Sequence, residues 1–160
     1  MQYVACLRVG QNDVKALINL EDVRRDVVVP LLDMRGDEDR HLQMFLTNWT
    51  EHPFFLDVSR VTKDVAEAFI TSNDLHNPHA AFENKRRFFS DVAGINENVI
   101  PVVSWVDDDP QRAVIQSALA LQGDFPHIAI RVTCPETPPR LRGIDCYRSW
   151  MLLKARTPRR

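Results

Sequence analysis

The stretch Val99-Ile-Pro-Val-Val-Ser-Trp105, together with the residues that follow it as far as Val132, decides the fold. It is short, apolar and rich in β-branched residues, which predicts a buried strand. Asp109-Pro110 has the pattern of a helix start, a capping residue followed by proline, and Gly123 closes the helix. A second apolar run, His127-Ile-Ala-Ile-Arg-Val132, comes next. A strand, a helix and a strand in this order predict a parallel βαβ unit.

Three more apolar runs precede this unit, and they predict strands at residues 2–8, 26–33 and 53–58. Stripes of apolar residues at helical spacing separate the runs. The stripes are formed by Val14, Ala16, Leu17 and Leu20; by Leu42, Phe45, Leu46 and Trp49; by Val61, Val65, Ala68 and Phe69; and by Ala81, Phe82, Phe88, Phe89 and Val92. We therefore expect an α/β fold with a mostly parallel five-stranded sheet and helices on both of its faces.

Two prolines and a charge run refine this pattern. Pro30 lies inside the run 26–33, and because proline cannot donate a ladder hydrogen bond we expect it at a strand start or at a bulge. Asn77-Pro78 predicts the start of the helix that carries the last stripe, and Gly94 predicts its end. Within that helix we interpret Lys85-Arg86-Arg87 as a solvated face.

The composition is that of an ordinary globular chain. It has 160 residues, 44% of them hydrophobic and 26% charged, with a net charge of -2 at pH 7. No apolar run approaches the roughly 18–20 residues that span a bilayer, and the N-terminus lacks the pattern of a signal peptide. Cys6, Cys134 and Cys146 include no close pair, which favours reduced thiols. We therefore predict a cytoplasmic protein with no membrane partner.

A basic tail follows an acidic body. Cys134-Pro-Glu-Thr-Pro-Pro139 breaks regular structure, so we divide the chain into an α/β domain at residues 1–133 and a basic, irregular tail at residues 134–160. Residues 140–160 contain seven basic residues and one acid. The weakly apolar patch Tyr147–Leu153 predicts a short helix or a short strand. The basic charge, with Tyr147 and Trp150 interleaved, could contact nucleic acid.

Each predicted strand ends in a polar residue, and the carboxyl ends of parallel strands meet at one edge of a sheet. These residues are Arg8, Asp33, Asp57, Ser104 and Arg131. Two carboxylates and two guanidinium groups on one edge could bind a polar or phosphorylated ligand. Strands also end where the chain meets water, so polar tips are expected without a ligand too. We predict these five residues as a ligand-binding site and assign no catalytic residue.

Signals for a metal or a cofactor are weak. Asp33 and Asp57 could share a divalent cation as hard oxygen ligands, but the sequence has no Cys-x-x-Cys pair. His76-x-x-His79 straddles the predicted helix start, which is a poor geometry for two ligands of one metal. Gly10-Gln-Asn-Asp lacks the further glycines of a dinucleotide-binding loop. We expect no metal and no cofactor.

Six short blocks occur in a definite order along the first 132 residues. They are Tyr3–Arg8, Asn12–Leu20, Val29–Asp33, Pro53–Ser59, Val99–Ser104 and Ile128–Val132. In order and spacing they resemble the N-terminal half of the bacterial and phage beta family, named after the beta protein of a satellite prophage. The resemblance implies a β/α-barrel of repeated strand–helix units, longer than this chain, in mobile elements that include a cassette linked to anti-phage defence.

The resemblance carries over no catalytic residue. By position, Arg8, Asp33, Asp57 and Arg131 match the polar strand ends of that pattern, with Asp33 where many relatives have Glu. Five strands cannot close an eight-stranded barrel, which needs about 200–250 residues. The chain is then either an N-terminal half, natural or frameshifted, or an open sheet. An incomplete barrel exposes an apolar face or edge, so we predict self-association or a protein partner.

Three functions stay open. The leading hypothesis, from the resemblance, is a component of a prophage or mobile-element defence or toxin-control module that acts by binding, with no evident catalysis. The second is a barrel-type enzyme acting on a phosphorylated or nucleotide substrate, with a strand-end carboxylate as general base or metal ligand. The third is nucleic-acid binding through residues 140–160.

Overall fold

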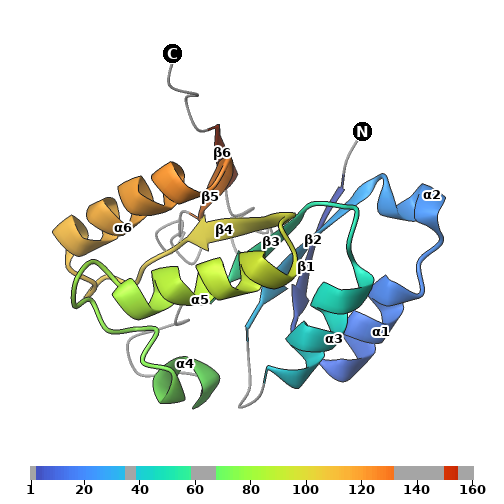
Figure 1. Ribbon diagram of the computed structural model, residues 1–160, viewed down its shortest axis with the longest axis horizontal. Helices are drawn as coiled ribbons and strands as arrows, with labels where there is room; N and C mark the ends of the chain where they lie inside the picture. Colours follow the sequence, from blue (N-terminus) through green and yellow to red (C-terminus); the bar gives the residue numbers. More distant parts are fainter. Residues whose placement is uncertain (1–2, 35–38, 59–67, 132–149, 155–160) are drawn as a thin grey trace, which may run out of the picture.

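In the part of the chain that the structure describes, five parallel strands and one antiparallel strand form a single sheet. The computed structural model describes residues 3–34, 39–58, 68–131 and 150–154 (Figure 1). The strands are β1 (Tyr3–Arg8), β2 (Val28–Asp33), β3 (Phe54–Asp57), β4 (Val99–Val103), β5 (His127–Arg131) and β6 (Trp150–Lys154). The helices are α1 (Gln11–Ile18), α2 (Asp22–Arg25), α3 (Arg40–Asn48), α4 (Ala68–Ser72), α5 (Glu83–Ile95) and α6 (Gln111–Asp124).

The strands lie in the sheet in the order in which they occur in the sequence, from β1 to β6. Neighbouring strands from β1 to β5 run parallel, and β6 pairs antiparallel with β5. This sequential order is that of a β/α barrel, whereas a doubly wound sheet reverses its order at a switch point. The predicted α/β class and the five parallel strands are therefore confirmed, and the sheet has the strand order of an incomplete barrel.

Two apolar cores occupy opposite faces of the sheet. The larger joins strand residues such as Leu32 and Leu56 to helix residues such as Phe45, Phe89 and Leu121. The smaller contains residues of strands alone in the described chain; they are Leu31, Phe55, Ile100, Val102 and Ala129. The described helices thus cover one face, and the expectation of helices on both faces is wrong for this part of the chain. Right-handed crossovers that always advance to the next strand place each helix on the same side.

Pro30 and Pro101 lie in the middle of two central strands. Pro30 pairs with Ala5 across the β1–β2 register, and Pro101 pairs with Leu56 across the β3–β4 register. Neither register contains a bulge, so the expectation of Pro30 at a strand start or a bulge is wrong. A proline removes one ladder hydrogen bond, and the residues on either side of it keep the strand paired.

Helix α5 begins at Glu83 and not at Asn77-Pro78, so the predicted start is wrong. The intervening chain makes a turn in which Ala80, Ala81 and Phe82 have φ values of 46°, 57° and 56°. Left-handed backbone costs about 1–2 kcal/mol for a residue with a side chain, so three in succession need support. Arg86 supplies it, because its guanidinium group donates to the carbonyl oxygens of Ala81 at 3.1 Å and Ala80 at 3.0 Å.

Most other helix and strand boundaries agree with those predicted from the sequence. Helix α6 starts directly after Pro110, and Gly94 and Gly123 lie in the last turns of α5 and α6 rather than beyond them. The strand alternative for the tail patch is observed in β6, whereas the other tail residues and Val61 and Val65 lie outside the described residues. The division at residue 133 therefore stays a prediction.

Within the described ranges, no helix has the length and apolar character that crossing a membrane requires.

Candidate functional site

The five predicted site residues lie at the carboxyl ends of five neighbouring strands. Strand residues two apart point to the same face, so Asp33, Asp57 and Arg131 share the face of the smaller core with Leu31, Phe55 and Ala129. Ser104 directly follows β4. The register sets Arg8 beside Asp33, and Asp33 beside Asp57. The structure therefore brings all five to one edge of the sheet, as the sequence predicts.

Asp57 is the centre of this cluster. Its side chain is 0% exposed. The hydroxyl of Ser104 donates to its Oδ1 atom at 2.8 Å, and the guanidinium group of Arg131 donates to its Oδ2 atom. A carboxylate buried without such partners would be strongly unfavourable, so Asp57 depends on both of them.

Arg131 also connects the two carboxylates. Its Nη1 atom lies 3.7 Å from Oδ2 of Asp33, and the side chains of Arg131 and Asp33 are each 14% exposed. One guanidinium group between two carboxylates offsets the repulsion between them. Arg8 adds the second positive charge, and it is exposed. The site thus consists of the buried Asp57, the exposed Arg8, and three half-buried residues, Ser104, Asp33 and Arg131.

Cys6 is a further member of this face that the strand-end pattern missed. It lies opposite Leu31 in the β1–β2 register, two residues before Arg8. Partial burial raises the pKa of its thiol; the Arg131 guanidinium acts in the opposite direction, and the Asp33 carboxylate adds to the increase. The two-residue period of a strand, counted back from Arg8, is the signal that could have found it.

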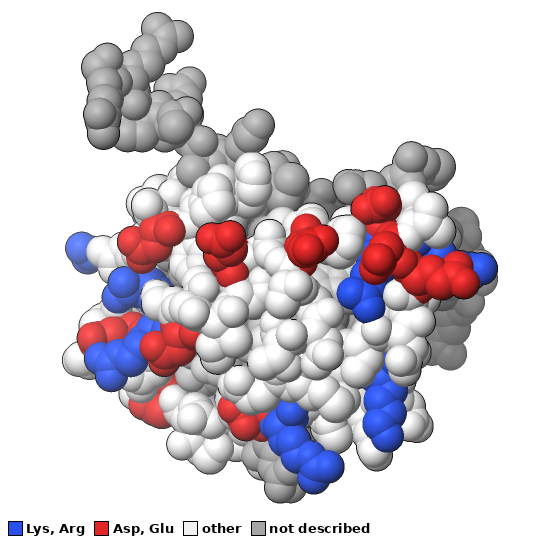
Figure 2. All heavy atoms as spheres, turned by 45° about the vertical axis from the view of Figure 1, so that its right-hand side comes forward, with Lys and Arg blue, Asp and Glu red and all other residues white. Residues whose placement is uncertain are grey.

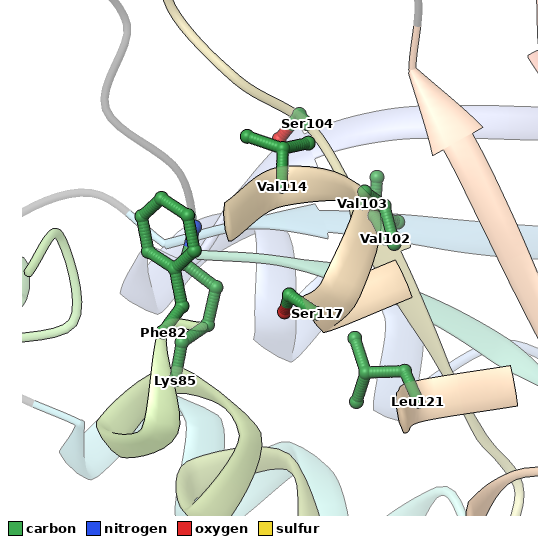
Figure 3. A pocket seen from close by; sticks show the side chains of 8 residues that line it. All are labelled: Phe82, Lys85, Val102, Val103, Ser104, Val114, Ser117 and Leu121. Carbon is green, nitrogen blue, oxygen red and sulfur yellow. The ribbon is translucent and has the colours of Figure 1, made fainter. Parts of the chain in front are cut away.

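A small cavity beside the cluster contains a buried lysine. It lies between α5, α6 and the end of β4, and Ser104 is one of the residues that line it (Figure 3). Lys85 is 8% exposed, so the interpretation of residues 85–87 as a solvated face is wrong for this residue. Its ammonium group lies 4.9 Å from the centre of the Phe82 ring, within the range of a cation–π contact.

Metal-ligand chemistry in the described chain, and charge on the face shown in Figure 2, add little to this site. No group of three or more His, Cys, Asp or Glu side chains that could hold a metal ion occurs among the residues the structure describes. Acidic and basic side chains are interspersed on the face shown in Figure 2, and the described residues form no continuous basic patch there. That face therefore has none of the electrostatic pattern expected of a nucleic-acid surface.

Comparison of the chain with protein-family models, with curated proteins and with solved structures gives no match. The geometry of the sheet edge and of the cavity beside it is therefore what indicates a function.

Proposed function

We propose that this protein is a binding component whose sheet edge takes a small polar ligand. The observation that carries the proposal is the convergence of Arg8, Asp33, Asp57, Ser104 and Arg131, from five separate strands, on one edge. Open α/β sheets bind their ligands in this place, outside the carboxyl ends of the strands. From the sequence resemblance, the setting that we propose is a prophage or mobile-element defence or toxin-control module.

The accessible residues define the character of the ligand. The exposed guanidinium group of Arg8 would bind an anionic group, and the oxygens of Asp33 would accept hydrogen bonds from a hydroxyl or an amine. Asp57 would stay beneath the ligand and hold Arg131 in place. The ligand that we propose therefore combines an anionic group with hydrogen-bond donors, as sugar phosphates and nucleotides do.

The same arrangement favours an enzyme as the second candidate. Asp33 lies at the sheet edge beside two guanidinium groups, where a carboxylate could act as a general base on a phosphorylated or nucleotide substrate. An NMR time course of each bound compound separates the two candidates. An unchanged spectrum supports binding alone, and conversion of the compound supports the enzyme.

A thermal-shift screen with nucleotides, sugar phosphates and divalent ions tests the site. We expect a saturable rise in the melting temperature of the wild type, because a ligand that binds the folded state stabilises it. Arg8→Ala and Asp33→Asn should lose this response. Arg24→Ala, an exposed change on α2, is the matched control and should keep it. No response in the wild type, or the same response in Arg8→Ala and Arg24→Ala, would contradict the proposal.

The cellular setting needs its own assay. A strain that carries the gene is challenged with phage beside strains that carry Arg8→Ala or no gene. Plating that depends on the gene and on Arg8 supports a defence role of the sheet edge. Equal plating and equal viability of all three strains would remove the defence and toxin-control proposal.

We also propose self-association through the outer edge of β1. Tyr3 and Val4 are 67% and 38% exposed, and within the described sheet β1 pairs with β2 alone. Such an edge is a template for another strand. Antiparallel pairing of two copies about Ala5 and Cys6 would set Arg8 opposite Tyr3 of the second copy, which keeps the two arginines apart.

A further inference from the structure

Helix α6 is the last in a row of helices and has one open flank. In Figure 1 the helices α1, α3, α5 and α6 lie in this order along one face of the sheet, and α6 contacts α5, β4 and β5. In a sheet whose strands follow the chain order, the helix after each strand lies beside the helix before it. The described chain has no helix between β5 and β6, so the flank of α6 away from α5 has no described neighbour.

That flank carries a groove with a largely apolar lining. The groove has a volume of about 470 Å³ and lies between α6, the end of β4 and β5. Its apolar residues are Val103, Trp105, Val114, Ile115, Ala118 and Ile130. Trp105 and Ile115 are 36% and 51% exposed, and Leu119, one turn after Ile115 on α6, is 63% exposed. Large apolar side chains that gather at one exposed place mark an interaction surface.

The spacing of these side chains suits a helix as the occupant. Ile115, Ala118 and Leu119 stand at i, i+3 and i+4 on α6, so two large side chains form a ridge beside the small Ala118. A second helix packs on such a surface with its axis about 8–10 Å away. Ile130 of β5 would supply the contact between that helix and the sheet.

The groove is also acidic at one end. Asp107 and Asp109 are among its residues, and no Lys or Arg of the described chain lines it. Asp109 accepts a hydrogen bond from the backbone N–H of Val106 at 2.9 Å, and Asp107 is exposed. Arg112, in the first turn of α6 and outside the lining, offsets part of this charge. An arginine that reaches Asp107 would also meet the indole of Trp105, a ring on which guanidinium groups stack.

Charge argues against a second copy of this chain as the occupant. On the other described helices the exposed large apolar residues, Val23 and Ile95, occur singly, so a second copy could offer only α6 itself. A two-fold pair of α6 helices sets Asp107 and Asp109 against Asp124 of the second copy if antiparallel, and against their own counterparts if parallel. Like charges that face each other oppose both arrangements.

The sequence between β5 and β6 disfavours a helix of the chain's own in this place. It contains Pro135, Pro138, Pro139 and Gly143, and each of these residues is unfavourable in a helix interior. A helix that covers the groove is therefore expected to come from another protein.

We propose that the groove beside α6 binds an amphipathic helix of a different protein. The apolar stripe of this helix would contact Ile115, Ala118 and Ile130, and an arginine near one end would contact Trp105 and Asp107. The bound helix would take the place that the helix after β5 has in a complete β/α barrel. This inference goes beyond the ligand site at the sheet edge and does not depend on it.

A pair of synthetic peptides tests the groove on the full chain. The first is an alanine-rich helix of about 18 residues, with leucines at i, i+3, i+4 and i+7 and an arginine in the turn before them. The second has glutamate in place of the arginine. By calorimetry we expect saturable binding of the arginine peptide, with the largest amide NMR shifts at Trp105, Ile115 and Ala118. The glutamate peptide should bind at least about 10-fold more weakly.

Two variants separate the apolar contact from the charged one. Ile115→Lys places a charge in the apolar lining and should weaken binding of the arginine peptide about 10-fold or more, whereas Val23→Lys, an exposed apolar change on α2, should not. Asp107→Lys should reverse the preference, so that the glutamate peptide binds better than the arginine peptide. Asp91→Lys, at an exposed aspartate on α5, should keep the wild-type preference. All four side chains are exposed, so we expect the variants to fold.

Several results would overturn the proposal. They are no saturable binding to the wild type, equal binding of the two peptides, and amide shifts away from the groove. Without peptide, a sedimentation coefficient that Ile115→Lys lowers and Val23→Lys does not would assign the groove to a second copy. Amide shifts at residues 132–149 in Ile115→Lys alone would assign it to the chain's own segment. Either assignment removes the partner helix.

The groove and the ligand site can fail separately. Arg8→Ala should bind the arginine peptide as the wild type does, because Arg8 lies at the end of β1 and does not line the groove. Loss of peptide binding in Arg8→Ala would contradict the independence of the two places.

Discussion

Asp57 is the residue on which the carboxyl edge depends most. Its two oxygens are engaged by a hydroxyl from the end of β4 and a guanidinium group from the end of β5, so it connects three strands. Its role is therefore to hold other side chains in position. In the ligand site that we propose, its neighbours Arg8 and Asp33 are the residues that contact the ligand.

We predict that Asp57→Ala lowers the free energy of unfolding by about 3–5 kcal/mol, because it leaves Arg131 as a largely buried charge without this partner. Urea denaturation measures the loss. Asp91→Ala, an exposed change on α5, should stay within about 0.5 kcal/mol of the wild type. Similar losses in the two variants would show that the buried ion pair contributes little.

Cys6 reports on the same edge through its reactivity. Because its pKa is raised, less thiolate is present near neutral pH than in an ordinary cysteine, and the thiolate is the reactive form. In a Cys134→Ser, Cys146→Ser background, we predict that alkylation of Cys6 by iodoacetamide rises with pH at a midpoint above that of the denatured protein. A midpoint at or below the denatured value would contradict the prediction.

At the scale of elements, the start of α5 shows how a side-chain contact to nearby backbone can override the preference of a capping sequence. Asn77-Pro78 has the sequence of a helix start, but the chain makes a left-handed turn before Glu83, because Arg86 holds two carbonyl groups that a helix from Pro78 would use internally. That contact joins a side chain to backbone within the same turn, and no periodic pattern encodes it.

The left-handed turn itself can be tested. Ala81→Gly should raise the free energy of unfolding by up to about 1 kcal/mol, because the relief of positive φ exceeds the cost of added freedom in the unfolded chain. Urea denaturation checks the sign. Ala93→Gly, inside α5, should lower the same quantity by about 1 kcal/mol or more. A loss of stability in both variants would show that the turn is not strained.

The positions of residues around helix α5 explain why its apolar face is predicted from the sequence and why the burial of Lys85 is not. Lys85, Phe89 and Val92 are its buried residues, at the spacing of one helical face. The apolar stripe from Ala81 to Val92 is predicted from the sequence, and Lys85 lies within its span, four residues before Phe89 on the same face. The sequence does not predict this burial, because lysine in a basic run normally faces water, whereas the structure leaves Lys85 only 8% exposed.

At the scale of the whole molecule, the strand pattern was predictable because buried parallel strands are nearly continuous apolar runs with polar ends. From this pattern alone, Asp33, Asp57 and Arg131 are expected to lie together. The pattern could not show that Asp57 is fully buried or that Arg131 contacts both carboxylates, because strand spacing fixes neighbours and leaves side-chain contacts open. The described helices lie on one face of the sheet because successive strands are neighbours in it. The apolar runs in the sequence do not encode this strand order.

The exposed edge of β1 predicts the oligomeric state. If two copies pair through β1, the wild type should sediment as a dimer, and Val4→Lys should shift it to the monomer, because lysine on an edge strand opposes pairing. Val23→Lys is the control, since Val23 is equally apolar and 72% exposed on α2. A monomeric wild type, or a dimer that Val4→Lys leaves intact, would contradict pairing through this edge.

The order of the strands, which lie side by side as they occur in the sequence, also affects how the chain can fold during its synthesis. Each parallel strand joins the edge left by the one before it, so no later segment has to insert between two that have already paired. Contacts between near neighbours in the sequence close quickly, and the N-terminal part of a chain emerges first. The sheet can therefore grow one strand–helix unit at a time during synthesis, and the polar edge is complete once the end of β5 has emerged.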